Sequence, residues 1–172
     1  MRRRTWMIAA GAALGTLAGG FAISGCTIAT PFKGPGYSRG EGVTLAGVGS
    51  TVVVSVTHAR VERSKRAVFD QHSARVVRSM GEHDGLIGYS VRRELLGDGV
   101  WTMTVWRDRD AVLNFANTRV HTDAMGEGLP AVKEMHFLRF ECPTREAPPS
   151  WTQALARLDE DIASRAAAAA RE

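Results

Sequence analysis

The sequence predicts an α+β domain of the ferredoxin-like split βαβ type, a four-stranded antiparallel sheet with both helices on one face. Segments with the two-residue period of strands and segments with helical periodicity follow one another in the order strand, helix, strand, strand, helix, strand. Gly97-Asp98-Gly99 predicts a tight turn that makes a hairpin of the second and third strands. Because the expected strands carry apolar residues on both faces, we expect a second copy of the chain to bury the face without helices, as a homodimer.

The first expected strand, residues 51–61, is rich in β-branched residues and should be central in the sheet. One face carries Val52, Val54, Val56 and His58, and the other carries Val53, Ser55, Thr57, Ala59 and Val61. A turn leads to a helix from Lys65 to Met80, and Gly81 ends it. Phe69, Val76, Val77 and Met80 recur there at helical spacing.

The hairpin and the second helix come next. Residues 86–96 form the second expected strand, and the third places Trp101, Met103 and Val105 on one face and Val100, Thr102, Thr104 and Trp106 on the other. Asp108 is the expected N-cap of a helix that continues to His121. Val112, Leu113, Phe115 and Ala116 supply its apolar face. A connector at 126–130 precedes the fourth strand at 132–141.

Residues 142–172 begin with a proline-rich break and end in a further helix. Ser150 is its expected N-cap. Trp151, Leu155, Leu158 and Ile162 fall on one helical stripe, which should dock on the edge of the domain or across the dimer.

The N-terminus has the parts of a secretory signal at residues 1–25: three arginines, an apolar run and a small-residue cleavage region. Ile23-Ser24-Gly25-Cys26 resembles the lipobox of bacterial lipoproteins, which implies cleavage before Cys26 and attachment of diacylglycerol to its thiol. The alternative is an uncleaved membrane helix, since roughly 18 apolar residues approach the length that spans a bilayer. Either outcome anchors the domain outside the cytoplasm, on a bacterial membrane.

Two further expectations concern export. Arg3-Arg4-Thr5-Trp6-Met7 resembles the twin-arginine signal, which leaves the general secretory and twin-arginine routes both open. The Gly- and Pro-rich residues 26–50 are expected to be a tether between the lipid and a single folded domain at 51–141.

Charge, cysteine content and histidine spacing give little support to nucleic-acid binding, an internal disulfide or a metal site. Without the three N-terminal arginines, Lys+Arg falls from 22 to 19 against 18 acidic residues, so the basic charge belongs to the signal and nucleic-acid binding has little support. A lipidated Cys26 leaves Cys142 without a disulfide partner. The five histidines lack the close paired spacing of a metal motif, and we expect no metal site. His72, His83 and His136 are interpreted as helix-surface, turn and strand residues.

The segments VVVSVTHARV, GLIGYSVRRELL and WTMTVWRDRDAVLNFANTRVHTDAM resemble the antibiotic biosynthesis monooxygenase family, over roughly residues 51–141. The resemblance implies a dimeric α+β barrel. It also implies an activity from a family that includes cofactor-independent oxygenases of aromatic polyketides, haem-degrading enzymes and many proteins of unassigned activity. Fold alone does not settle which of these applies.

The candidate site residues are as follows. His121 and His58 could transfer protons, because the pKa of a histidine lies near neutrality, and His121 could also bind iron. Trp106 and Phe115 could hold a flat substrate. The plainer interpretation is a solvated histidine at position 121, a core-edge histidine at 58 and a core tryptophan at 106.

Haem-degrading members of the family use an asparagine, a tryptophan and a histidine. By the resemblance, the asparagine position falls near Thr57 or His58, the tryptophan position at Phe115 and the histidine position near Met125. None of the three matches, and His121 lies about one helical turn early. We therefore do not expect haem degradation by the family's residues, although a relocated histidine ligand stays open.

Three functional hypotheses follow. The first is an exported, membrane-tethered monooxygenase-like enzyme that acts on a flat aromatic or quinone-like molecule without metal or flavin, with His121 or His58 as the base and Trp106, Phe115 and Thr57 lining the site. The second is a non-catalytic ligand- or haem-binding lipoprotein. The third is a structural dimeric module whose interior is filled by side chains.

Overall fold

The computed structural model describes residues 26–171, and the expected signal sequence, including the first three lipobox residues, lies outside them. Its main feature is one antiparallel sheet in the order β1-β5-β6-β4-β7. The strands are β1 (Thr27–Ala29), β4 (Thr51–Val61), β5 (Leu86–Glu94), β6 (Gly99–Trp106) and β7 (Val132–Pro143). A small second sheet pairs β2 (Tyr37–Ser38) with β3 (Gly42–Val43).

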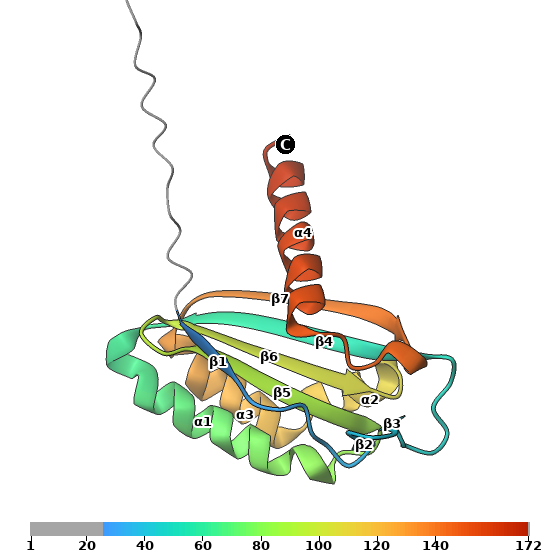
Figure 1. The fold of residues 1–172 in the computed structure, drawn as a ribbon. Coiled ribbons are helices and arrows are strands. Elements are labelled where there is room, and N and C mark those ends of the chain that lie inside the picture. Colours follow the sequence, from blue (N-terminus) through green and yellow to red (C-terminus); the bar gives the residue numbers. More distant parts are fainter. Residues whose placement is uncertain (1–25, 172) are drawn as a thin grey trace, which may run out of the picture.

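Four α-helices of residues 26–171 lie on the two sides of this sheet: α1 (Arg66–Ser79), α2 (Arg109–Ala116), α3 (Arg119–Gly128) and α4 (Trp151–Ala169). The first three lie on one face, and α4 rises from the other (Figure 1). The order of β4, β5, β6 and β7 is that of the ferredoxin-like fold. The predicted fold class and the C-terminal helix are therefore confirmed.

The central strands β4 and β6 have buried residues on both faces, as the alternation predicted. Val54 of β4 lies opposite Val105 of β6, and both belong to the core on the α4 side. Val53 lies opposite Trp106, and both belong to the core on the side of α1 and α2. Because side chains alternate along a strand, this one pairing register supplies two separate cores.

Residues 27–50 are not the free tether that their composition predicted. β1 pairs with β5, with Thr27 opposite Glu94, so the sheet has five strands within the described residues instead of four. Partly buried apolar side chains of the following segment pack on the α4-side core: Phe32, Tyr37, Val43, Leu45 and Val48. The sequence pattern missed this because its few apolar residues are spaced irregularly between glycines and prolines.

Residues 27–50 and α4 cover the sheet face that was expected to need a second copy of the chain. The face expected to need a second copy is covered, over its valine-rich part, by residues 32–48 and by Ala154 and Leu158 of α4. The homodimer stays a prediction, but the apolar face no longer requires it.

The expected helix from Asp108 to His121 is two helices. Asp108 caps α2 as predicted, since its carboxylate accepts a hydrogen bond from the Ala111 amide at 2.8 Å. The chain then leaves helical geometry at Thr118 (φ −67°, ψ 149°), whose hydroxyl accepts a hydrogen bond from the His121 amide and so caps α3. Asn, Thr and similar side chains compete with the helix by bonding to nearby backbone groups, which explains the break. The helix α3 then continues through Gly128, where a connector was expected.

The C-terminal helix begins with the expected cap. Ser150 and Gln153 form a reciprocal capping box. Leu158 of the predicted stripe is buried, and Trp151 and Ile162 pack partly against the core. Beyond Ile162 the helix is exposed and projects away from the sheet. None of the helices from residue 26 to residue 171 is long and apolar enough to cross a membrane.

The packing of residues 27–50 on the sheet gives a stability prediction. A Cβ at Gly34 would lie 2.2 Å from the Gly88 Cα and 2.4 Å from the Ile87 carbonyl oxygen, both backbone atoms that cannot move aside alone. Gly34→Ala should therefore lower the free energy of unfolding by about 1 to 3 kcal/mol, the usual range for overpacking, as measured by urea denaturation.

Gly40→Ala is the matched control, because a Cβ there meets no atom within 4 Å. It should change the free energy of unfolding by no more than about 0.5 kcal/mol. Equal effects of the two substitutions would mean that the segment does not pack on the sheet in solution.

Candidate functional site: an apolar cavity between the sheet and the helices

A cavity of about 680 Å³ lies between the helix-facing side of the sheet and helices α1, α2 and α3. This volume is within the range that holds a small organic molecule. Its walls are mainly apolar, with Phe69, Val76, Val77, Met80, Val91, Val100, Trp106, Val112, Phe115, Met125, Met135 and Phe137 among them. The floor is formed by small polar residues of the central strands: Ser55, Thr57, Thr102 and Thr104.

Four of the five residues predicted from the sequence for catalysis or substrate binding line this cavity: Thr57, Trp106, Phe115 and His121. Trp106 is fully buried, and its indole Nε1 donates a hydrogen bond to Thr104 Oγ1 at 2.8 Å. The Phe115 ring lies against it, with 5.0 Å between ring centroids. The two rings are inclined by 32° to each other and form an aromatic part of the wall. Trp106 is a core residue and a lining residue at the same time.

His121 has a defined tautomer. Its Nδ1 lies 3.0 Å from the carbonyl oxygen of Ala116, at the end of α2. A carbonyl oxygen can only accept, so Nδ1 carries the hydrogen and Nε2 keeps its lone pair in the neutral ring. The position of His121 in the first turn of α3, directly after the Thr118 cap, brings this contact about.

Burial lowers the pKa of His121 below its ordinary value of 6.5, and the positive charge of Arg139 lowers it further. The hydrogen bond to Ala116 opposes both effects but does not cancel them. Near neutral pH His121 is therefore an uncharged base beside an apolar cavity, the state in which an imidazole accepts a proton.

Arg139 is the site residue that the sequence analysis missed. It comes from the edge strand β7 and lines the cavity together with a second arginine, Arg93. Arg93 is paired with Asp70 at 3.1 Å, whereas Arg139 forms no ion pair with any residue between 26 and 171. An unpaired guanidinium at an apolar cavity favours a negatively charged ligand. Alternation along the expected strand 132–141 could have placed it on the cavity face.

His58 does not belong to this site. It lies on the opposite face of the sheet, where its ring stacks on Trp101 with 4.5 Å between centroids and an interplanar angle of 5°. Burial lowers the pKa of His58, and the neighbouring His136 adds to this effect. His58, expected as an alternative base to His121, therefore does not line the cavity, because it alternates along β4 in phase with Val52, Val54 and Val56.

His72 also differs from its prediction. It was expected on a helix surface but is buried, with 8% of its area exposed. Its Nδ1 lies 3.0 Å from a carboxylate oxygen of Glu127. Because His72 is on α1 and Glu127 is on α3, this contact joins the two helices that cover the cavity.

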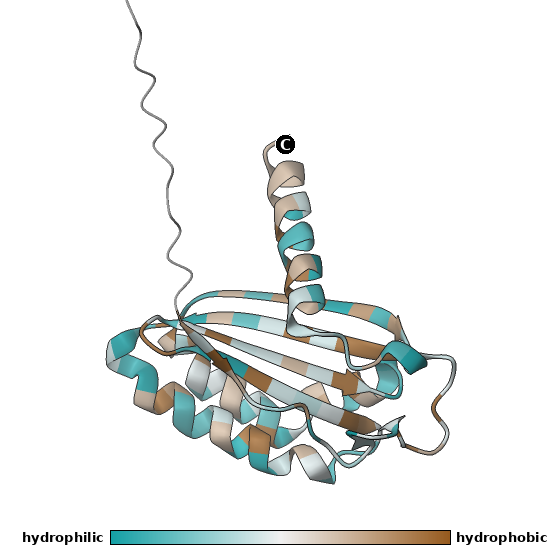
Figure 2. Cartoon of the chain, in the orientation of Figure 1, coloured by the Kyte–Doolittle hydropathy of each residue, from teal (hydrophilic) through white to brown (hydrophobic). Residues whose placement is uncertain are grey.

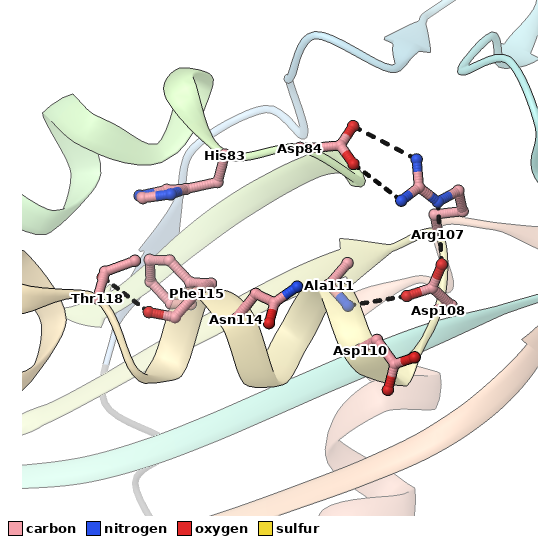
Figure 3. Close-up of a pocket in the computed structure, with 9 residues that line it drawn as sticks. All are labelled: His83, Asp84, Arg107, Asp108, Asp110, Ala111, Asn114, Phe115 and Thr118. Atoms are coloured by element: carbon pink, nitrogen blue, oxygen red, sulfur yellow. Dashed lines mark hydrogen bonds and ion pairs between the residues drawn. The ribbon is translucent and has the colours of Figure 1, made fainter.

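A smaller polar hollow of about 260 Å³ lies at the start of α2 (Figure 3). Arg107 donates to Asp84 at 3.3 and 2.9 Å and to Asp108 at 2.9 Å, and this pairing lowers the pKa of Asp84. Phe115 lines both this hollow and the large cavity, and its ring has His83 on one edge and His121 on another. The Asp84–Arg107 pair joins the turn before β5 to the turn before α2.

With this geometry established, the domain can be compared with known proteins. Residues 52–127 match the antibiotic biosynthesis monooxygenase family. The match covers β4, α1, β5, β6, α2 and α3 up to its last turn but not β7, and it agrees with the resemblance expected from the sequence. No curated protein matches the chain.

Solved structures agree on the fold. A conserved protein from Methanosarcina mazei Go1 is similar with a TM-score of 0.50 and 15% identity, over 53% of this chain and 92% of the other. A protein from Mycobacterium tuberculosis is similar with a TM-score of 0.51 and 12% identity, over 56% of this chain and 98% of the other. Identities this low show a shared fold alone.

The residues that the resemblance implies for haem degradation are absent from this domain. Thr57, Phe115 and Met125, which stand at or near the three positions, line the cavity without supplying an asparagine, a tryptophan or a histidine. Among the described residues, no group of three His, Cys, Asp or Glu side chains could hold a metal ion.

The two histidines with lowered pKa values lie on opposite faces, so each should respond to its own neighbour. Removing the positive charge in Arg139→Gln should raise the pKa of His121 and leave that of His58 unchanged. His136→Gln should raise the pKa of His58 and leave that of His121 unchanged. The pKa values are read from the ring-proton shifts of the histidines in an NMR titration. A substitution that moves both values, or a His121 that titrates above 6.5, would contradict this assignment.

Proposed function

We propose that this protein is a membrane-tethered, monooxygenase-like enzyme that oxidises a flat aromatic or quinone-like molecule without metal or flavin. The observation that carries the proposal is the neutral His121, with its free Nε2, at an aromatic-walled cavity that also holds the unpaired Arg139. Thr57, Trp106 and Phe115 are the other proposed substrate contacts.

Each of these residues has a separate proposed role. A planar substrate would lie against the Trp106 and Phe115 rings, which offer apolar faces for stacking. His121 would accept a proton from an activated carbon or phenol of the substrate through Nε2, while Ala116 holds its Nδ1 hydrogen and stabilises the imidazolium that forms. Arg139 would stabilise the resulting substrate anion.

The chemistry balances with molecular oxygen as the oxidant. An activated CH₂ group loses a proton to His121, and the carbanion transfers electrons to O₂ and forms a carbon–oxygen bond. Reprotonation by His121 and loss of water then convert the CH₂ into a carbonyl. One oxygen atom enters the product and the other leaves as water, and the substrate supplies all the electrons.

The location proposed for this activity is the outer side of a bacterial membrane. The support is the N-terminal sequence: three arginines, an apolar run and the lipobox-like residues before Cys26. Cys26 is exposed and Cys142 is buried, so the thiol at the lipobox position is the one open to modification.

The alternative is a non-catalytic ligand- or haem-binding lipoprotein with the same fold. The observation in its favour is again His121, because a neutral imidazole at an apolar cavity suits haem iron as well as a proton. Haem titration would test it: a Soret band that is absent in His121→Ala, together with no oxygen uptake, would favour this alternative over the enzyme.

The enzymatic proposal predicts oxygen consumption that depends on His121. With an anthrone or a hydroquinone as substrate, His121→Ala should lower kcat/KM on the order of a hundredfold, the lower end of the contribution expected from a general base. The measurement uses an oxygen electrode and product analysis by mass spectrometry. His58→Ala is the matched control, because His58 lies on the opposite face, and its rate should equal that of the unmodified protein. No oxygen uptake with any such substrate, or equal rates for the two variants, would refute the proposal.

The pH dependence follows from the same residue. His121 must be neutral to act as a base and its pKa is lowered, so the acid limb of kcat/KM should be centred below pH 6.5. Arg139→Gln should move this fall to higher pH, because it removes a charge that opposes protonation. An acid limb centred above pH 6.5 in the unmodified protein would contradict His121 as the base.

A further inference from the structure

The most exposed large apolar side chains among residues 26–171 meet at one corner of the domain. Leu96 has 81% of its surface exposed and Leu95 has 56%, and both lie in the turn between β5 and β6. We call these two residues the leucine tip. Figure 2 shows this turn as a hydrophobic segment at the end of the sheet. Two adjacent exposed leucines in a turn, where polar residues are usual, require an explanation.

The leucine tip lies beside Cys26. The backbone amide of Leu95 donates a hydrogen bond to the carbonyl oxygen of Cys26 at 2.9 Å, so the point where the described chain begins is fixed at this corner. Ile28, with 54% of its surface exposed, follows two residues later. The proposed lipid attachment and the exposed apolar side chains are therefore on the same corner of the molecule.

The turn is held in place by a charged network. Arg60 donates twice to the Asp98 carboxylate, each time at 3.1 Å, and Lys133 also pairs with it. These contacts lower the pKa of Asp98 to about 2. The amide of Val61 donates to the Asp98 carbonyl oxygen at 3.0 Å. Strands β4 and β7 are thus both tied to the turn, and the leucines are exposed on a fixed backbone.

Two backbone polar groups of the tip are also paired. Arg63 donates to the carbonyl oxygen of Leu96 at 2.7 Å, and the Leu95 amide has its partner in Cys26. Unpaired backbone groups resist transfer out of water, so this pairing lowers the cost of placing the turn at a membrane interface. The Arg63 guanidinium is in no ion pair with another described residue, which leaves its charge available for a lipid phosphate.

We propose that the leucine tip is a membrane-docking site that inserts Leu95 and Leu96 into the interface of the bilayer that carries the Cys26 lipid. This inference rests on the membrane location proposed above and adds an orientation: the β5–β6 turn faces the lipid and α2 lies at the far end of the sheet. The cavity residue Val100 is four residues beyond Leu96, so the proposed substrate cavity extends to the membrane-facing end of the sheet.

The experiment uses the full-length protein purified from bacterial membranes and reconstituted into vesicles of phosphatidylcholine and phosphatidylglycerol. One environment-sensitive fluorescent amino acid replaces Leu96, introduced by stop-codon suppression. In the control variant it replaces Leu113, an exposed leucine of α2 with 41% of its surface open. Quenching by lipids that carry a bromine or nitroxide on the acyl chain reports insertion of the probe. Mass spectrometry of the same samples reports whether Cys26 carries diacylglycerol.

We expect a blue shift and quenching at position 96 and neither at position 113. Equal signals at both positions would overturn the proposal that the leucine tip inserts into the bilayer. This holds even when mass spectrometry shows that Cys26 carries lipid, because the lipid anchor is a separate proposal. Quenching at position 96 alone with an unmodified Cys26 supports the tip and refutes the lipid anchor. A blue shift at position 96 without vesicles that grows with protein concentration identifies a second copy of the chain as the occupant and also overturns the proposal.

Discussion

The structure depends on one constraint: the central strands β4 and β6 must bury both of their faces. Their pairing places Val54, Val56, Met103 and Val105 on one side of the sheet and Ser55, Thr57, Thr102 and Thr104 on the other. The first side is bulky and apolar, and it gains most from dense packing. It is covered by residues 32–48 and by the first half of α4. The second side is small and polar at its centre, and the helices above it enclose a cavity of about 680 Å³. The same two-residue alternation therefore produces the core and the candidate site.

The break between α2 and α3 gives the cavity its chemistry. In one continuous helix the Ala116 carbonyl would bond to a backbone amide further along the chain. The Thr118 cap turns the chain instead and leaves this carbonyl to accept the Nδ1 hydrogen of His121. Burial keeps the ring neutral, and the broken helix presents Phe115 beside it. A helix terminus inside the domain thus fixes the orientation and the tautomer of a histidine at the cavity.

Strands and their faces could be predicted from the sequence because alternation is a local property, and it assigned Thr57, Trp106 and His58 to their correct faces. What failed depended on contacts between distant segments. Residues 27–50 have no regular period, and their order comes from the close approach of Gly34 to Gly88, which no local pattern reports. The burial of His72 depends on α3 crossing α1. The break at Thr118 has a local signal, since Asn and Thr both favour helix caps, but the sequence pattern did not separate it from a helix that reaches His121.

The central claim is that a flat aromatic ligand binds between the sheet and the helices rather than on the opposite face. Methionine methyl NMR tests it directly, because Met80, Met125 and Met135 line the cavity while Met103 is buried in the core on the α4 side. Titration with a water-soluble anthraquinone sulfonate, an unreactive flat quinone with one negative charge, should shift the first three methyl signals saturably and leave that of Met103 unchanged. A shift at Met103 without shifts at the other three, or no saturable shift at any of them, would contradict the account.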